Sequence, residues 1–222
     1  MILRKIKQAL KPFYAPTVNQ VTHMLFGPKR YSNLFSALKK TKASKIMEVG
    51  TWSGARAIKL ISLAKSFHPA DQIEYYGFDL FEGMTDESFV HEISKRPPTQ
   101  AEVQHALEQT GAEITLFKGD TLKTLPDNTP SLPKMDLIFI DGGHSLDTIA
   151  NDWKYSEQLM HERTIVVFDE YWLNRADGGC KSLIDSLDRN VYIVNLSKQT
   201  DRFVNESFGL LEIKFAIVSK KI

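Results

Sequence analysis

Five short apolar runs separated by helical stretches constrain the fold more than any other feature of the sequence. The runs cover residues 44–49, 73–79, 113–118, 135–141 and 164–169. Several are nearly continuous in apolar side chains, as expected for strands that are buried on both faces of a parallel sheet. Helical patterns cover residues 55–66, 99–110 and 146–160. This alternation predicts βαβ units and an α/β fold, with an open, doubly wound sheet that carries helices on both faces.

The tail of the chain departs from this alternation. Residues 191–196 and 212–219 are two strand-like runs with no convincing helix between them, which predicts an antiparallel hairpin at one edge of the sheet. With 222 residues, of which 42% are hydrophobic, the chain is long enough for one well-filled core and short for two. We therefore expect one domain over residues 41–222, preceded by a helical extension over residues 1–40 that packs on it.

The overall charge and the cysteine content limit the partners and the compartment. The formal net charge is +1, from 28 basic and 27 acidic residues, and there is no recognisable basic stripe with interleaved aromatic residues. Such a chain is not expected to bind nucleic acid. Cys180 is the single cysteine, so no internal disulfide can form, and a cytoplasmic location is expected.

Two segments outside the predicted sheet have open interpretations. The pattern of residues 1–11 predicts a short amphipathic helix with an apolar side and several basic residues. This helix either packs on the edge of the domain, which we favour, or makes a peripheral contact with a membrane surface or a partner. Stable membrane insertion is not expected, because no stretch approaches the length that spans a bilayer. The polar segment 84–98 predicts a long loop or short helix of a length typical of lids, and a homodimer is compatible with the sequence.

Acidic residues stand at or near the end of each predicted strand. They are Glu48, Asp79, Asp120, Asp141 and Asp169. A single acid at a strand end is commonly only a turn or cap residue. In an open parallel sheet, however, ligands bind outside the carboxyl ends of the strands. Five acids at this edge therefore predict a ligand site there.

The turn after the first strand indicates the kind of ligand. Gly50 and Gly54 permit a tight turn into a helix whose free N–H groups can face a ligand. The spacing is G-x-x-x-G, and Trp52 stands where a dinucleotide-binding turn has its middle glycine. Glu48 would repel a pyrophosphate but attract a ligand that carries an ammonium and a sulfonium group. S-adenosylmethionine is such a ligand.

Several segments taken together resemble a known family. They are EVGTWSG, YYGFDLFEG, GDTLKTLP, MDLIFIDGGHS and IVVFDEYW, and the match covers about residues 40–220. In this combination the chain is similar to the class I S-adenosylmethionine-dependent methyltransferases, in the small-molecule O-methyltransferase-like branch that carries an IDG-x-H segment. The resemblance implies a Rossmann-like sheet of seven strands in the order 3-2-1-4-5-7-6, with an antiparallel last strand. It also implies an enzyme that methylates a hydroxyl of a small molecule or sugar.

The resemblance assigns roles in cofactor binding to eight residues. They are Glu48, Gly50, Thr51, Ser53, Gly54, Asp79, Asp120 and Thr121. The glycine turn would hold the methionine part of S-adenosylmethionine, with Glu48 near its ammonium group. Asp79 would accept hydrogen bonds from the ribose hydroxyls, and Asp120 with Thr121 would lie against the adenine. In the alternative interpretation these acids are only caps and turn residues.

The ends of the fourth and fifth strands bring further carboxylates together. Neighbouring strands lie about 4.8 Å apart, so Asp141 can approach Asp169 and Glu170. Close carboxylates repel each other unless a cation or proton intervenes, and oxygen ligands suit Mg²⁺. The resemblance likewise implies a metal-dependent O-methyltransferase in which these three residues hold Mg²⁺, although Glu170 stands where a shorter Asp or Asn is usual. In the alternative, Asp141 shapes a turn and Asp169 caps a loop.

His144 is the predicted general base. Gly142 and Gly143 give the loop freedom to direct this imidazole into the cleft, although it can also be a helix-start residue bonded to backbone. With Mg²⁺ present, the ion would lower the pKa of the acceptor hydroxyl. In a metal-independent enzyme of the same fold, His144 or Asp141 would act as the base. A third hypothesis is a non-catalytic, Rossmann-like nucleotide-binding protein.

Overall fold

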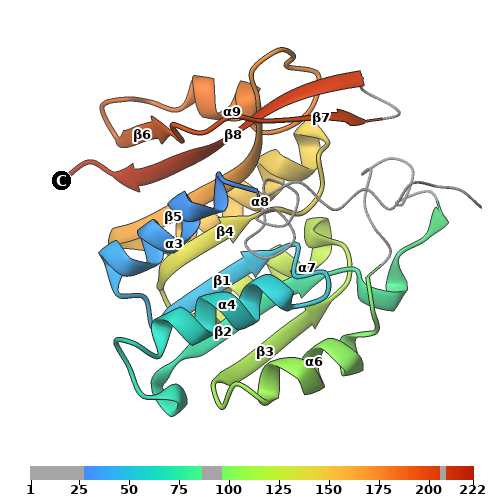
Figure 1. Ribbon diagram of the computed structural model, residues 1–222, viewed down its shortest axis with the longest axis vertical. Helices are drawn as coiled ribbons and strands as arrows, with labels where there is room; N and C mark the ends of the chain where they lie inside the picture. The colour runs from blue at the N-terminus through green and yellow to red at the C-terminus, as the bar shows by residue number, and fades with distance from the viewer. Residues whose placement is uncertain (1–27, 87–96, 206–208) are drawn as a thin grey trace, which may run out of the picture.

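The computed structural model describes residues 28–86, 97–205 and 209–222, and Figure 1 shows their arrangement. The predicted helix of residues 1–11 and most of the segment 84–98 lie outside the described residues. The described chain forms an eight-stranded sheet with helices packed on both faces. This is the doubly wound α/β architecture that the sequence predicts.

Five neighbouring strands of the sheet are parallel to one another. They are β1 (Lys45–Val49), β2 (Glu74–Asp79), β3 (Glu113–Lys118), β4 (Met135–Ile140) and β5 (Met160–Trp172). Consecutive side chains of a strand point to opposite faces, and in β1 both Ile46 and Met47 are fully buried. Helices on both faces therefore account for the nearly continuous apolar runs in the sequence.

Antiparallel pairing joins three further strands to the sheet. They are β6 (Tyr192–Leu196), β7 (Asp201–Asn205) and β8 (Gly209–Lys220). β8 lies between β5 and β6, and its first residues pair with β7. The order β3-β2-β1-β4-β5-β8-β6 confirms the predicted order with its inserted last strand. β7 is a strand that the sequence did not predict. It pairs with the first residues of β8, which begins at Gly209, before the predicted run at 212–219.

Helices cover the two faces of the sheet (Figure 1). On one face pack α3 (Tyr31–Thr41), α4 (Ala55–Ala64) and α6 (Gln100–Glu108), and on the other α7 (Thr121–Asn128), α8 (Leu146–Gln158) and α9 (Lys181–Ser186). Short 3-10 turns occur at η1 (Ala70–Gln72), η2 (Phe81–Gly83) and η3 (Thr129–Ser131). Leu34 of α3 and Leu60 of α4 belong to one apolar cluster, and Trp153 of α8 belongs to the other. Among the helices built from the described ranges, none combines the length and apolarity needed to cross a lipid bilayer.

Side-chain caps fix where two helices begin at the carboxyl edge of the sheet. Asp120 accepts a hydrogen bond from the N–H of Leu122 (2.9 Å) at the start of α7. Ser145 accepts one from the N–H of Thr148 (3.2 Å) at the start of α8. Such caps satisfy N–H groups that have no partner inside the first turn. Because α7 and α8 begin shortly after β3 and β4, the residues that connect them stay close to the strand ends.

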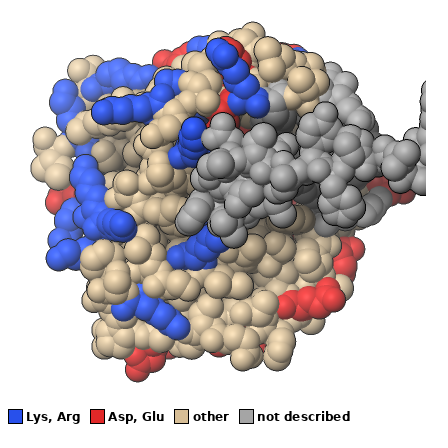
Figure 2. Space-filling model, in the orientation of Figure 1, with Lys and Arg blue, Asp and Glu red and all other residues tan. Residues whose placement is uncertain are grey.

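Charged side chains are distributed unevenly over the face shown in Figure 2. Lysine and arginine side chains gather over α3 and over the edge formed by β6 and β8, whereas acidic side chains in this view lie mostly near its margins. Lys39 and Lys40 occupy the last turn of α3. Their charge complements the negative end of the helix dipole, so these two lysines help to stabilise α3.

Candidate active site

The turn between β1 and α4 has the backbone geometry that its two glycines predict. Gly50 has a φ of +93° and Gly54 a φ of +72°, both in the left-handed region that favours glycine. A Cβ on Gly50 would lie 2.1 Å from the backbone oxygen of Asp141. The turn and the end of β4 are therefore in direct backbone contact, and a larger residue at position 50 would force them apart.

Asp79, at the end of β2, is hydrogen-bonded to this turn. Its Oδ2 accepts a hydrogen bond from the N–H of Trp52 (2.7 Å), and its Oδ1 accepts one from the N–H of Phe81 (3.0 Å). Trp52 has a φ of +46°, a strained conformation that this bond helps to hold. Burial raises the pKa of Asp79, although the backbone hydrogen bonds oppose the rise. The structure thus places the predicted ribose acid beside the glycine turn.

Glu48 lies in β1, two residues before Gly50, and is fully buried. The hydroxyl of Tyr75 donates a hydrogen bond to its Oε2, and Nη1 of Arg56 lies 3.6 Å from its Oε1. Burial raises the pKa of Glu48 to about 7, although the charge of Arg56 and the hydrogen bond from Tyr75 oppose the rise. A buried carboxyl group of this kind can ionise when a cationic group approaches it.

The other predicted cofactor residues lie at two places. Thr51 is buried, with its hydroxyl 3.2 Å from that of Tyr75, and Ser53 is partly exposed in the same turn. Asp120 and Thr121 lie at the start of α7, where Asp120 is the exposed N-cap. The structure therefore gives Asp120 a capping role, and its role at the adenine stays a prediction.

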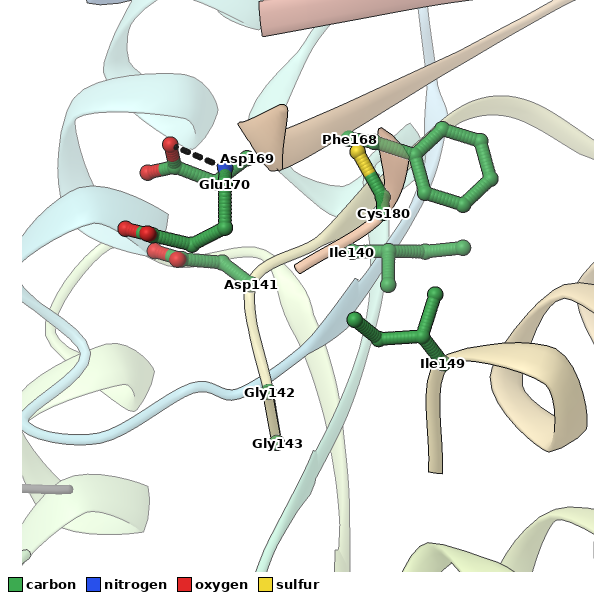
Figure 3. A pocket seen from close by; sticks show the side chains of 9 residues that line it. All are labelled: Ile140, Asp141, Gly142, Gly143, Ile149, Phe168, Asp169, Glu170 and Cys180. Atoms are coloured by element: carbon green, nitrogen blue, oxygen red, sulfur yellow. Dashed lines mark hydrogen bonds between the residues drawn. The ribbon is translucent and has the colours of Figure 1, made fainter. Parts of the chain in front are cut away.

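Asp141, Asp169 and Glu170 come together where β4 ends and its pairing with β5 stops, and all three line one small pocket. Figure 3 shows their carboxylates on one side of the strand ends, with the apolar side chains of the pocket on the other side. Oδ1 of Asp169 accepts a hydrogen bond from the N–H of Glu170 (2.7 Å). Glu170 has a φ of +61°, a strained conformation of the kind that gathers at functional sites.

Two arginines pair with these carboxylates. Arg30, which precedes α3, donates from Nε to Oδ1 of Asp169 (2.8 Å) and from Nη2 to Oδ2 (2.9 Å). Arg56, in the first turn of α4, pairs through Nη1 with Oδ2 of Asp141. The hydroxyl of Tyr31 donates to Oδ2 of Asp169 (3.0 Å) and accepts a hydrogen bond from Nη2 of Arg56. The start of α3, the start of α4 and the sheet edge thereby meet in one charged cluster.

The three carboxyl groups of this cluster have pKa values shifted in different directions. Burial raises the pKa of Asp141 to about 7, although Arg56 opposes the rise. Burial alone would raise the pKa of Asp169 as well, but Arg30 outweighs it and holds that pKa below its ordinary value. Burial and the negative charge of Asp169 raise the pKa of Glu170 to about 8. Asp169 is therefore the group of the three that stays ionised most firmly.

The residues predicted to hold Mg²⁺ do not fit a divalent ion in this arrangement. Both oxygens of Asp169 accept hydrogen bonds from Arg30, and Asp141 faces Arg56. The carboxylate of Glu170 accepts a hydrogen bond from an indole N–H. Mg²⁺ needs oxygen atoms that are free to coordinate it, and two guanidinium groups would repel it. Across residues 28–86, 97–205 and 209–222, no group of three or more His, Cys, Asp or Glu side chains is arranged to hold a metal ion.

His144 lies in the connection between β4 and α8, close to the end of β5. Its carbonyl oxygen accepts a hydrogen bond from the N–H of Gly179 (2.9 Å), and its ring centre is 6.3 Å from that of Trp172. A Cβ on Gly178 would lie 2.7 Å from the same indole, so the loop before α9 passes close over it. The fold thus holds the loops after β4 and β5 together, and the catalytic role of His144 stays a prediction.

Three residues of the cluster had not been singled out from the sequence, namely Arg30, Tyr31 and Arg56. Arg56 follows Gly54 by two residues, so its place in the first helical turn beyond the glycines is a signal that could have located it. Arg30 offers no comparable signal, because it lies 139 positions before Asp169. The packing of α3 on the sheet brings the two together.

Comparisons with known proteins agree with this geometry. A family model described as a methyltransferase domain matches residues 47–171, more than half of the chain. No curated protein matches the sequence. The chain is similar in structure to the O-methyltransferase TomG from Streptomyces achromogenes, which is involved in tomaymycin synthesis and was solved with S-adenosylmethionine (16% identity, 98% of this chain and 96% of that chain covered, TM-score 0.55). It is also similar to an O-methyltransferase from Bacillus cereus solved with S-adenosylhomocysteine (15% identity, 99% and 97% covered, TM-score 0.56).

The fold that this chain shares with both structures is a methyltransferase fold. An rRNA methylase from Streptococcus thermophilus shares the same fold (9% identity, 87% of this chain and 98% of that chain covered, TM-score 0.57). The chain belongs to the methyltransferase-domain family, whose model covers more than half of it. The resemblance of the sequence motifs to methyltransferases is thereby confirmed.

Proposed function

We propose that the chain transfers a methyl group from S-adenosylmethionine to a hydroxyl group of a small molecule or a sugar. The observation that carries this proposal is the buried Glu48 carboxyl group two residues before Gly50, with Asp79 hydrogen-bonded to the glycine turn. A carboxylate at this place suits the ammonium group of the cofactor and would repel a pyrophosphate. The involvement of TomG in tomaymycin synthesis supports a small-molecule acceptor.

In this proposal the chain binds the cofactor at three points. Glu48 ionises and pairs with the ammonium group, while the Gly50–Gly54 turn lies against the methionine part. Asp79 accepts hydrogen bonds from the ribose hydroxyls. The cofactor supplies an electrophilic methyl group on its sulfonium. Because methyl transfer is an in-line displacement, the main tasks left to the protein are to align the acceptor oxygen and to remove its proton.

We assign the removal of the proton to His144, with Asp141 as the alternative base. Both residues follow β4 at the edge where the glycine turn lies, and His144 is held there by the hydrogen bond to Gly179. Imidazole is the side chain that enzymes use most often as a general base. This assignment needs no metal ion, whereas Mg²⁺ at Asp141, Asp169 and Glu170 would have to displace the arginine contacts.

Two further parts of the proposal rest on composition. A net charge of +1 supports a small acceptor over a nucleic acid, because binding to phosphate backbones is dominated by positive charge. The single cysteine, Cys180, is buried, and a chain without disulfides suits the cytoplasm.

Calorimetric titration with S-adenosylmethionine, S-adenosylhomocysteine and NAD tests the cofactor assignment. We expect the first two to bind in a one-to-one ratio, because both carry the ammonium group that Glu48 would pair with. NAD is expected not to bind, since its pyrophosphate would approach a carboxylate. Binding of NAD without binding of S-adenosylmethionine would contradict the proposed function and favour a nucleotide-binding protein.

A further inference from the structure

The carboxylates where β4 ends and its pairing with β5 stops already hold cations that belong to the chain. Arg30 binds both oxygens of Asp169, and its Nη1 donates to Oδ2 of Asp201 (2.9 Å). The Arg30 side chain is 7% exposed and that of Asp169 is 1% exposed. A bidentate arginine–carboxylate pair fixes geometry as well as charge. Arg30 is therefore a buried cation held by two acids from different strands.

Arg56 extends this arrangement toward the glycine turn. Its Nη1 pairs with Asp141 and also lies 3.6 Å from Oε1 of Glu48. Its guanidinium carbon is 4.2 Å from the ring centre of Tyr31, a distance at which a cation is attracted to an aromatic face. The hydroxyl of Tyr31 then joins Arg56 to Asp169. Asp141, which follows β4, and Asp169, within β5, are thus connected through groups of α3 and α4.

We propose that Arg30 and Arg56, the arginine pair, take the place of the divalent ion that a cluster of carboxylates at this position would otherwise need. Close carboxylates require a neutralising cation or proton, and here guanidinium groups supply the charge. A divalent ion would have to displace the donors that bind Asp169 while it approached two positive groups. The identification of the site rests on the proposed function, but the exclusion of metal from it can be tested without any methyl transfer.

Titration with Mn²⁺, followed by electron paramagnetic resonance, tests the inference, because the signal of free Mn²⁺ is lost when the ion binds. The full chain is expected to bind no Mn²⁺ at this site, with or without S-adenosylhomocysteine, so wild type and Asp169→Asn should give the same curve. Arg30→Gln removes a guanidinium group and leaves the carboxylates. It is expected to gain a Mn²⁺ site at least about 10-fold tighter than any binding by the wild type, and a further Asp169→Asn should remove that gain.

Two variants serve as controls. Arg163→Gln changes an exposed arginine near the amino end of β5, far along the strand from the cluster, and should match the wild type. Arg30→Lys keeps a positive charge and should also exclude Mn²⁺. A wild-type chain that binds Mn²⁺ and loses it in Asp169→Asn would overturn the inference, and this comparison needs no variant of Arg30.

A folded Arg30→Gln chain that gains no Mn²⁺ site would overturn the inference as well, because the carboxylates alone would then not attract an ion. Failure of the wild type to bind S-adenosylmethionine would contradict the proposed function instead. The two failures are distinguishable, since the Mn²⁺ titration requires neither the cofactor nor the acceptor.

Discussion

Replacing Arg30 with alanine is expected to lower the free energy of unfolding by about 3–5 kcal/mol. The substitution removes two hydrogen bonds to Asp169 and one to Asp201. It leaves Asp169 as a buried carboxylate without its guanidinium partner, and such an uncompensated charge costs more than the ion pair itself contributes. Urea denaturation at neutral pH, followed by circular dichroism, measures the difference from the wild type.

Two companion variants separate this effect from a general loss of surface charge. Arg202→Ala removes an ion pair with Glu212 in which the Arg202 side chain is 70% exposed, so a loss of at most about 1 kcal/mol is expected. Arg30→Met combined with Asp169→Leu removes both buried charges and should recover a large part of the stability, because apolar side chains of similar size replace buried pairs well. Equal losses of unfolding free energy in Arg30→Ala and Arg202→Ala would contradict the claim that buried Arg30 stabilises the fold more than an exposed arginine does.

Replacing Glu48 with glutamine is expected to weaken the binding of S-adenosylmethionine by about 30-fold or more, which corresponds to about 2 kcal/mol. Glutamine keeps the shape of the side chain and can still accept the hydrogen bond that Tyr75 donates to Glu48. It has no negative charge with which to pair the ammonium group. The fold should therefore persist while the affinity falls, and calorimetry at pH 8 measures the loss.

The same carboxyl group predicts a pH dependence of binding. Burial raises the pKa of Glu48 to about 7, and the ammonium group favours the ionised form. Affinity should therefore be full above pH 7 and fall by up to about tenfold per pH unit below it, and Glu48→Gln should lose this dependence. Glu74→Gln is the matched control. Glu74 pairs with Lys45 at the start of β2, whereas the cofactor residue Asp79 lies at the end of this strand. A wild-type affinity that stays constant or rises between pH 8 and pH 6 would contradict the role of Glu48.

Most of the sheet could be predicted because strands buried on both faces leave continuous apolar runs. The run at 135–141 covers β4, in which every residue except Asp136 is buried. The edge position of the tail strands follows from the lack of a helical pattern in the sequence between 196 and 212. Two helices on the second face were not predicted. α7 contains Pro126, and α9 has six residues, so neither shows a sustained helical period.

The site could be predicted in part for a similar reason. Parallel strands end at the same edge, so Asp141, Asp169 and Glu170 were expected together, and they do line one pocket. The groups that neutralise them could not be predicted from strand ends. Arg30 reaches Asp169 through the packing of a helix 139 positions away in the chain, and such long-range side-chain pairing leaves no periodic pattern in the sequence. The sequence predicted a metal site because it shows the carboxylates near the strand ends but does not show that arginines pair with them.

Transfer of a labelled methyl group tests the central claim most directly. A metabolite extract is incubated with the chain and with S-adenosylmethionine that carries a trideuterated methyl group, and products are analysed by mass spectrometry. The proposed function predicts a product with one trideuterated methyl group on a hydroxyl oxygen, absent without the chain and strongly reduced with Glu48→Gln. Label on nitrogen or carbon, or equal amounts of product with the wild type and Glu48→Gln, would contradict it.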